Sequence, residues 1–79
     1  MLAEALEHLV RGIVDNPDDV SVKERTHRRG MTLKVRVHPG DMGRVIGKAG
    51  RTATALRTVV SSLAGRDGVR IDFVDTTEH

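Results

Sequence analysis

The 79-residue sequence contains no cysteine, no tryptophan and no tyrosine, and Phe73 is its only aromatic residue. Without cysteine the chain can form neither disulfides nor cysteine-ligated zinc sites, which fits a reducing cytoplasm. The near absence of aromatic side chains disfavours RRM and cold-shock modules, because these stack nucleic-acid bases on several aromatic rings.

Long apolar runs are also missing. None approaches the roughly 18 residues that a membrane-spanning helix needs, and the opening segment carries Glu4, Glu7 and Arg11 within its apolar pattern, unlike a signal peptide. We therefore expect no contact with a membrane and one soluble, cytoplasmic domain over residues 1–79. A domain of this size buries only about 60% of the surface that its unfolded chain exposes, so its core should be modest.

The charges are unevenly distributed, although the formal net charge is only +2. Residues 1–20 hold five acids against one base, residues 21–57 hold ten bases against two acids, and residues 58–79 hold two bases against four acids. The middle segment therefore has a net charge of +8. Such a concentration of positive charge suggests a polyanionic partner, the alternative being a solvated, charge-rich surface.

Apolar periodicity predicts a helix and then two strands in the first half of the chain. A helical stripe with spacings of three and four ends before Pro17, which disfavours a helical conformation at the residue before it. From Val20 the period changes to two, and Gly30 suits a turn between two strands. The second strand has the clearest alternation, with Met31, Leu33, Val35 and Val37 on one face. The helical stripe consists of Leu2, Leu6, Leu9, Val10 and Ile13.

The second half predicts two helices and a final strand. Residues 41–47 can form a short helix with Val45 and Ile46 facing inward. Residues 51–64 read as a longer helix that Gly65 ends. Its apolar stripe consists of Ala53, Leu56, Val60 and Leu63, widened by Val59. The last strand is predicted by a period of two, in which Val69, Ile71 and Phe73 alternate with Arg70, Asp72 and Val74. The expected class is α+β in the order α-β-β-α-α-β, with a three-stranded sheet and a frayed tail at residues 76–79.

Two G-x-x-G segments flank the short helix. In "GKAG", Gly47 and Gly50 permit a tight turn, and its N–H groups lie at a helix N-terminus, where the dipole favours anions. Lys48 adds a mobile positive charge. The other segment, "GDMG", carries Asp41, which would repel phosphate, so we interpret it as a turn that leads into the helix. By itself a G-x-x-G pattern is common and can be a plain helix–helix turn.

The context of "GKAG" is more specific. The stretch "VIGKAGRTATALRTVV", the opening "LEHLVRGIVDNPDDV" and the element order together resemble the KH domain in its type II (bacterial) form. The resemblance is closest to the small stand-alone bacterial KH proteins of the KhpA type and covers the chain from Leu2 to about Asp75. It implies a single KH domain, with the helices on one face of the sheet, whose loop clamps about four nucleotides of single-stranded RNA.

The resemblance also implies which residues contact RNA. Gly47, Lys48, Ala49 and Gly50 would grip the sugar–phosphate backbone. Val45 and Ile46 would form an apolar floor under the bases, unless one or both are plain core. Arg44 and Arg51 would flank the backbone, and Lys34 and Arg36 on the second strand would line the other wall or form only a solvated strand face.

The resemblance to KhpA-type proteins also implies partners and a cellular role. The resemblance implies self-association, pairing with a larger multidomain KH protein of the KhpB (Jag) type, and a role as an RNA chaperone or post-transcriptional regulator. A contrasting hypothesis is that the chain is a protein-interaction subunit whose partner makes most of the RNA contact. The sequence itself identifies no interface.

No pattern for an enzyme or a cofactor is complete. A mononucleotide-binding phosphate loop is a further hypothesis, but the spacing in "GRVIGKA" is one residue short, and Ala49 stands where the hydroxyl ligand of magnesium should be. The four histidines lack metal-ligand spacing. Ser61 and Ser62 lack a nucleophile elbow. We therefore expect no catalytic residues, no metal and no cofactor.

Overall fold

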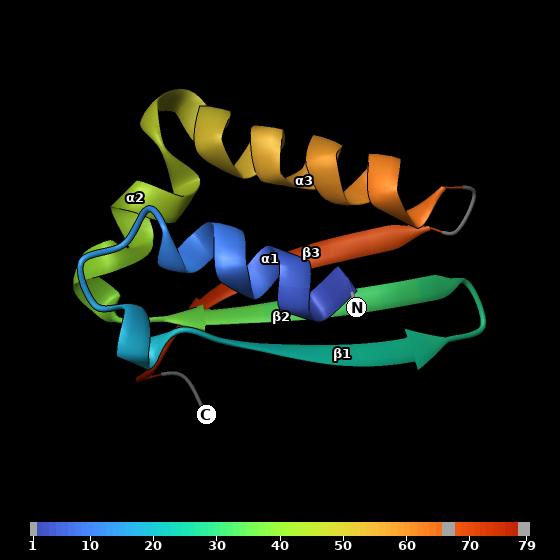
Figure 1. Ribbon diagram of the computed structural model, residues 1–79, viewed down its shortest axis with the longest axis horizontal. Helices are drawn as coiled ribbons and strands as arrows, with labels where there is room; N and C mark the ends of the chain where they lie inside the picture. The colour runs from blue at the N-terminus through green and yellow to red at the C-terminus, as the bar shows by residue number, and fades with distance from the viewer. Residues whose placement is uncertain (1, 66–67, 78–79) are drawn as a thin grey trace.

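The computed structural model describes residues 2–65 and 68–77 (Figure 1). The order α-β-β-α-α-β that the sequence predicts is confirmed. The main elements are α1 (Leu2–Arg11), β1 (Ser21–His27), β2 (Gly30–Val37), α2 (Met42–Ile46), α3 (Arg51–Ala64) and β3 (Val69–Asp75). Three short 3-10 turns, η1 (Pro17–Asp19), η2 (Pro39–Asp41) and η3 (Lys48–Gly50), join them.

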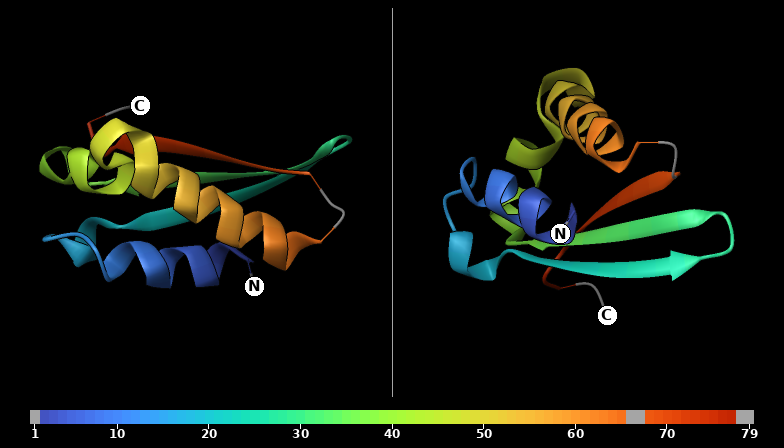
Figure 2. Two further views of the ribbon diagram at one scale, coloured as in Figure 1. Left: turned by 90° about the horizontal axis from the view of Figure 1, so that it is seen from above. Right: turned by 45° about the vertical axis from the view of Figure 1, so that its right-hand side comes forward.

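The three strands form one mixed sheet in the order β1-β2-β3. β1 and β2 are an antiparallel hairpin, whereas β2 and β3 are parallel and are connected through α2 and α3. All helices lie on the same side of the sheet, with α1 over β1 and α3 over β3 (Figures 1 and 2). The opposite face of the sheet carries no helix, and β3 is an edge strand.

The core fills the space between the helices and the covered face of the sheet. Alternation along β2 directs Leu33, Val35 and Val37 toward the helices, and all three are fully buried. Helical spacing likewise directs one apolar face of α1 and one of α3 toward the sheet. The buried cluster consists of Leu6, Val10, Val20, Leu33, Val35, Val37, Val45, Leu56, Val60 and Ile71. The inward face that the sequence predicts for β2 is therefore confirmed, whereas Val74 of β3, which alternation groups with Arg70 and Asp72 on the other face, is also buried.

Three residues that the helical stripes place inward are instead exposed. Leu9 of α1 is 38% exposed, and Val59 and Leu63 of α3 are 44% and 60% exposed. A three-stranded sheet is narrow, so each helix can bury only the central part of its apolar stripe against it. Periodicity correctly predicted both helices but overestimated the width of their buried faces.

Backbone geometry defines the end of α3 and the end of β3. Gly65 ends α3 in the left-handed region with φ 70°, as the sequence predicts. Beyond β3, the Thr76 N–H donates to the Val37 carbonyl at 2.9 Å, which holds the chain one residue past the strand. The rest of the predicted frayed tail includes residues 78 and 79, which lie outside the described residues. No helix within residues 2–65 or 68–77 is long and apolar enough to cross a membrane.

Candidate nucleic-acid interface

The GKAG loop between α2 and α3 has an unusual backbone. Gly47 (φ 77°), Ala49 (φ 56°) and Gly50 (φ 75°) all have positive φ, a region that glycine tolerates and alanine rarely adopts. At Gly47 a Cβ would also overlap with the side chain and backbone nitrogen of Thr52. The loop therefore requires its first glycine for space and its second for conformation. A strained alanine between them is a feature that clusters at functional sites.

The neighbouring GDMG segment lacks this backbone. Neither Gly40 nor Gly43 has a positive φ, and Gly43 lies inside α2. The Gly40 N–H donates to Nδ1 of His38 at 2.9 Å, so this segment turns the chain from β2 into α2. The two G-x-x-G segments are thus different structures, as their interior residues suggested.

The GKAG loop presents donors and charge to solvent. Lys48, Ala49 and Arg51 are exposed. Gly50 is the N-cap of α3, a helix of 14 residues, and no side chain caps it. The N–H groups of the first turn of α3 therefore lack a side-chain acceptor, and the helix dipole adds partial positive charge beside Lys48. An anion that approaches the loop meets backbone donors and little side-chain bulk.

The apolar pair before the loop divides between core and surface. Val45 is fully buried, whereas Ile46 is partly exposed and lines a surface depression. A side chain without accessible surface cannot contact a base, so Val45 belongs to the core. Of the apolar floor that the resemblance implied, Ile46 is the member that reaches solvent.

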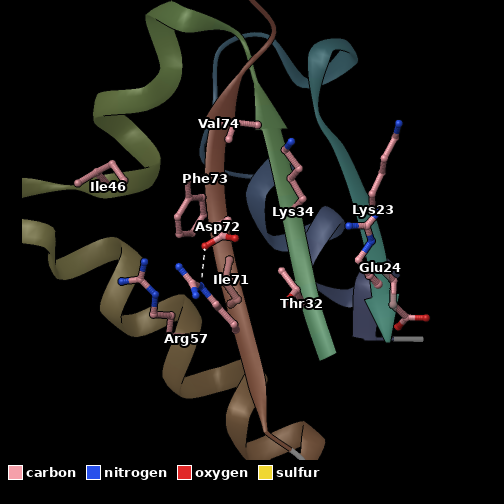
Figure 3. A pocket seen from close by; sticks show the side chains of 12 residues that line it. Lys23, Glu24, Thr32, Lys34, Ile46, Arg57, Ile71, Asp72, Phe73 and Val74 are labelled. Atoms are coloured by element: carbon pink, nitrogen blue, oxygen red, sulfur yellow. Dashed lines mark hydrogen bonds and ion pairs between the residues drawn. The ribbon is translucent and has the colours of Figure 1, made fainter. Parts of the chain in front are cut away.

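This depression, of about 870 Å³, runs along the edge strand β3. On its helix side lie Ile46, Arg57 of α3 and Phe73 of β3 (Figure 3). The Arg57 guanidinium carbon is 5.6 Å from the centroid of the Phe73 ring, so the two side chains meet between α3 and β3. Both have flat surfaces on which a base can stack. Ile46 directly precedes Gly47, so the groove reaches the start of the GKAG loop, although no residue of the loop lines it.

Sequence reasoning missed Arg57 and Phe73. A signal for Arg57 was present, because it lies four residues after the buried Ala53 and three before Val60, at the margin of the buried stripe. Phe73 was assigned to the strand without a role at the surface. Its meeting with Arg57 depends on how α3 crosses β3, which periodicity does not report.

The predicted strand bases lie on the helix-free face. Lys34 is partly exposed and lines the depression, on the opposite side of β3 from Arg57 (Figure 3). Arg36, two residues further along β2, is also partly exposed but does not line it. The structure therefore separates these residues from the GKAG loop by the edge strand.

Arg44 is already engaged within the protein. Its guanidinium pairs with the Asp15 carboxylate at 3.1 Å, and both side chains are more than half exposed. The pair links the α1–β1 connection to α2, directly before the GKAG loop. A phosphate that binds Arg44 must therefore compete with Asp15. Arg51, at the first turn of α3, is exposed and sits beside the loop as expected.

A buried carboxylate holds the same connection in place. Asp41 is 1% exposed and accepts hydrogen bonds from the Asp15 N–H at 3.2 Å and from the backbone and side-chain nitrogens of Asn16 at 3.0 and 3.1 Å. Burial by itself raises the pKa of Asp41, but these hydrogen bonds and the nearby His38 outweigh it, and the pKa lies below its ordinary value. Asp41 therefore fixes the start of α2 as an ionised group.

Comparison with known proteins agrees with this arrangement. Residues 3–74 match the family model described as KhpA/KhpB, KH domain. The RNA-binding protein KhpA of Streptomyces coelicolor is 69% identical over 75 residues, covering 95% of this chain and 94% of the relative. Its counterpart from Mycobacterium tuberculosis is 62% identical over 78 residues (99% and 96%), and that from Halalkalibacterium halodurans 47% over 72 residues (89% and 95%). The chain therefore belongs to the KhpA/KhpB family of KH domains.

Proposed function

We propose that this protein binds single-stranded RNA and holds its sugar–phosphate backbone at the GKAG loop. The observation that carries the proposal is the loop itself. Its left-handed backbone at Gly47, Ala49 and Gly50 exposes Lys48 next to the uncapped N-terminus of α3. Relatives that match nearly the whole chain are named RNA-binding proteins, which supports RNA as the ligand.

Electrostatics should supply most of the affinity. The loop lies within the segment of residues 21–57, whose net charge is +8, and Arg51 adds a second base beside Lys48. Phosphate contacts release counterions, so the logarithm of the binding constant should fall linearly with the logarithm of the salt concentration. Each contact with a single strand should add about 0.7 to the slope of this fall. Binding should therefore be strongly salt-dependent.

The groove along β3 should receive the bases. Ile46 provides an aliphatic floor, and the Arg57–Phe73 pair provides flat surfaces on the same side of β3. A single aromatic gives only one ring for stacking, and each stacked base contributes about 1–3 kcal/mol. We therefore expect modest affinity and low sequence preference. These properties suit an RNA chaperone or post-transcriptional regulator that acts in the cytoplasm without catalytic activity.

Exposed apolar side chains favour a second chain as an additional partner. Val59 and Leu63 lie one helical turn apart on α3 and are 44% and 60% exposed. We propose this surface for self-association, or for pairing with a larger KH protein of the KhpB (Jag) type. Two linked binding sites can raise avidity by roughly 10²–10⁴ when geometry permits. Leu63→Asp should shift a self-associating protein toward the monomer in sedimentation, whereas an unchanged mass would exclude this surface from the homodimer.

Fluorescence anisotropy with a labelled single-stranded RNA tests the main proposal. The wild type and the double variant Lys48→Asp, Ala49→Asp are compared at two salt concentrations. Aspartate adopts left-handed backbone angles more readily than alanine, so the variant should keep its fold. A control with the same change in charge, His8→Asp with Arg11→Asp, alters exposed residues of α1. Melting curves establish that all three proteins are folded.

The proposal expects salt-dependent binding by the wild type and the control but not by the loop variant. Equal binding by all three would show that the loop is only a turn. Equal loss in the control and the loop variant would show that net charge, not the loop, attracts RNA. Absence of binding by the folded wild type would contradict the proposal and favour the protein-interaction subunit.

A further inference from the structure

The helix-free face of the sheet carries a second group of basic side chains. Strand pairing places Lys23 opposite Lys34 and Arg25 opposite Thr32, with all four side chains on this face. Arg70 of β3 also lies there but forms an ion pair with Asp72 at 3.1 Å. Among the residues that the structure describes, no acid pairs with Lys23, Arg25 or Lys34. We call these three residues the open-face bases.

Across β1 and β2, Lys23 and Lys34 bring two like charges together, whereas on the other side of Lys34 the register of β3 places Asp72 beside it on the same face. Like charges directly opposite one another on antiparallel strands are destabilising. Other strand positions on this face, such as Ser21, show that neutral polar side chains fit it. Asp72 is engaged by Arg70 at 3.1 Å, and among the described residues no ion pair joins it to either lysine, so the two ammonium groups point to an anion that binds between them.

The open-face bases are continuous with the groove. The same depression that contains Ile46 and Arg57 on the helix side of β3 reaches Lys34, Lys23 and Arg25 on the other side. Figure 3 shows Ile46 and Arg57 to one side of β3, and Lys34 and Lys23 to the other. The carboxylates of Glu24 and Asp72 also line this depression, but its basic side chains outnumber them. An RNA strand that leaves the groove can therefore cross the edge of the sheet and remain in a depression of net positive charge.

We propose that the open-face bases form a second phosphate-binding site for the same RNA strand, which wraps around β3 after leaving the groove. This inference rests on the RNA binding proposed above. The site takes backbone rather than bases, because the only Phe, Tyr or Trp of the sequence, Phe73, pairs with Val35 on the helix side, and the imidazole of His27 on the open face is hydrogen-bonded to Thr32 at 3.0 Å. The GKAG loop would hold about four nucleotides, and the open-face bases would hold the phosphates that follow. RNA length should therefore decide whether the second site contributes.

A length series separates the two sites. Anisotropy is measured with oligouridylates of about four and about ten nucleotides, for the wild type and for Lys23→Gln with Lys34→Gln. The variant should bind the short RNA like the wild type and the long RNA at least about threefold more weakly, with a salt slope lower by about 0.7 for each lysine. Lys23→Gln alone is compared with Arg11→Gln, which removes one equal charge from α1. The control should bind both lengths like the wild type.

Thermal melting distinguishes a direct contact with RNA from an effect of the lysines on the stability of the fold. Lys23→Gln relieves the like-charge pair and leaves Lys34 beside Asp72, so the melting temperature of this single variant should stay the same or rise while binding of long RNA falls. Loss of binding together with loss of stability would overturn the proposal, because the lysines would then act through the fold.

The other possible results of the length series show which of the two proposed sites fails. Equal weakening for short and long RNA, or equal weakening by Arg11→Gln, would mean that the lysines contribute only to net charge and would overturn the second site. Unchanged binding at both lengths would do the same while leaving the loop proposal intact. If the wild type binds neither length, both proposals fail. If the loop variant Lys48→Asp, Ala49→Asp keeps weak binding to long RNA that the lysine variant removes, the second site is supported independently of the loop.

Discussion

The Arg57 guanidinium of α3 lies 5.6 Å from the centre of the Phe73 ring of β3, so a helix and an edge strand meet through a cation and an aromatic face. This contact stands at the wall of the groove that begins near the GKAG loop. A cation over a ring at a partly exposed site contributes only about 0.5–1 kcal/mol to stability. Its position in the groove suggests that the larger effect is on RNA.

Replacement of Arg57 tests this role. Arg57→Gln should weaken RNA binding and lower the salt slope by about 0.7, because one phosphate or stacking partner is lost. Arg57→Lys should restore the salt slope but not the full affinity, since lysine keeps the charge and loses the planar surface. Anisotropy measures both, with Arg11→Gln as the control. If lysine restored binding completely, the charge alone would matter.

The three glycines around α2 should respond differently to alanine. Gly47→Ala should cost about 2–4 kcal/mol, because the new Cβ overlaps with Thr52 and the backbone is left-handed. Gly50→Ala has open space and should cost only about 1–2 kcal/mol, from its φ of 75°. Gly43→Ala lies in a helix with nothing nearby and should stabilise by about 0.5–1 kcal/mol. Urea unfolding measures all three, and any other order would contradict the loop geometry.

Asp41 should make the stability of the fold depend on pH in the acidic range. Folding lowers its pKa below the ordinary 3.8, so its contribution is complete above that value and is lost as the pH falls through the lowered folded-state pKa. Asp41→Asn should melt at a lower temperature than the wild type at pH 7, and the difference should shrink below pH 4. Melting curves from neutral to strongly acidic pH test this. Parallel curves would show that the carboxylate charge does not stabilise the fold.

Release of Arg44 should strengthen RNA binding. Asp15→Asn removes its ion-pair partner, and exposed pairs contribute about 0.2–1 kcal/mol, so affinity should rise roughly 1.5- to 5-fold. Asp18→Asn changes the charge equally, at an exposed residue that has no pair with Arg44. Anisotropy at low salt compares them. A similar gain in both variants would attribute the effect to net charge.

The buried side of α3 can be tested by truncation. Leu56 is buried and Leu63 is 60% exposed. Leu56→Ala should lower the free energy of unfolding by about 2–5 kcal/mol, whereas Leu63→Ala should change it by less than about 0.5 kcal/mol in a monomer. Urea unfolding measures the two losses. Similar losses would mean that both leucines share the core, as the helical stripe alone suggested.

The sequence predicted elements better than it predicted faces. Alternation in β2 identified Leu33, Val35 and Val37 as core, because a strand has only two faces and one of them is covered. A helix has a continuous circumference, so its stripe in α3 did not reveal that Val59 and Leu63 fall outside the contact with the sheet. For the same reason the pattern could not separate the buried Val45 from the accessible Ile46.

The features that follow from the amino-acid chain alone are local: the order of helices and strands, the turns, and a glycine loop with a lysine before a helix. Periodicity and backbone preference act over a few residues, so they can be read directly from the chain. Contacts between side chains that are distant in the sequence depend instead on how the elements pack. Arg57 reaches Phe73, Asp15 engages Arg44, and Lys23 faces Lys34, because the crossing of α3 over β3, the return of the α1–β1 connection and the strand register bring them together.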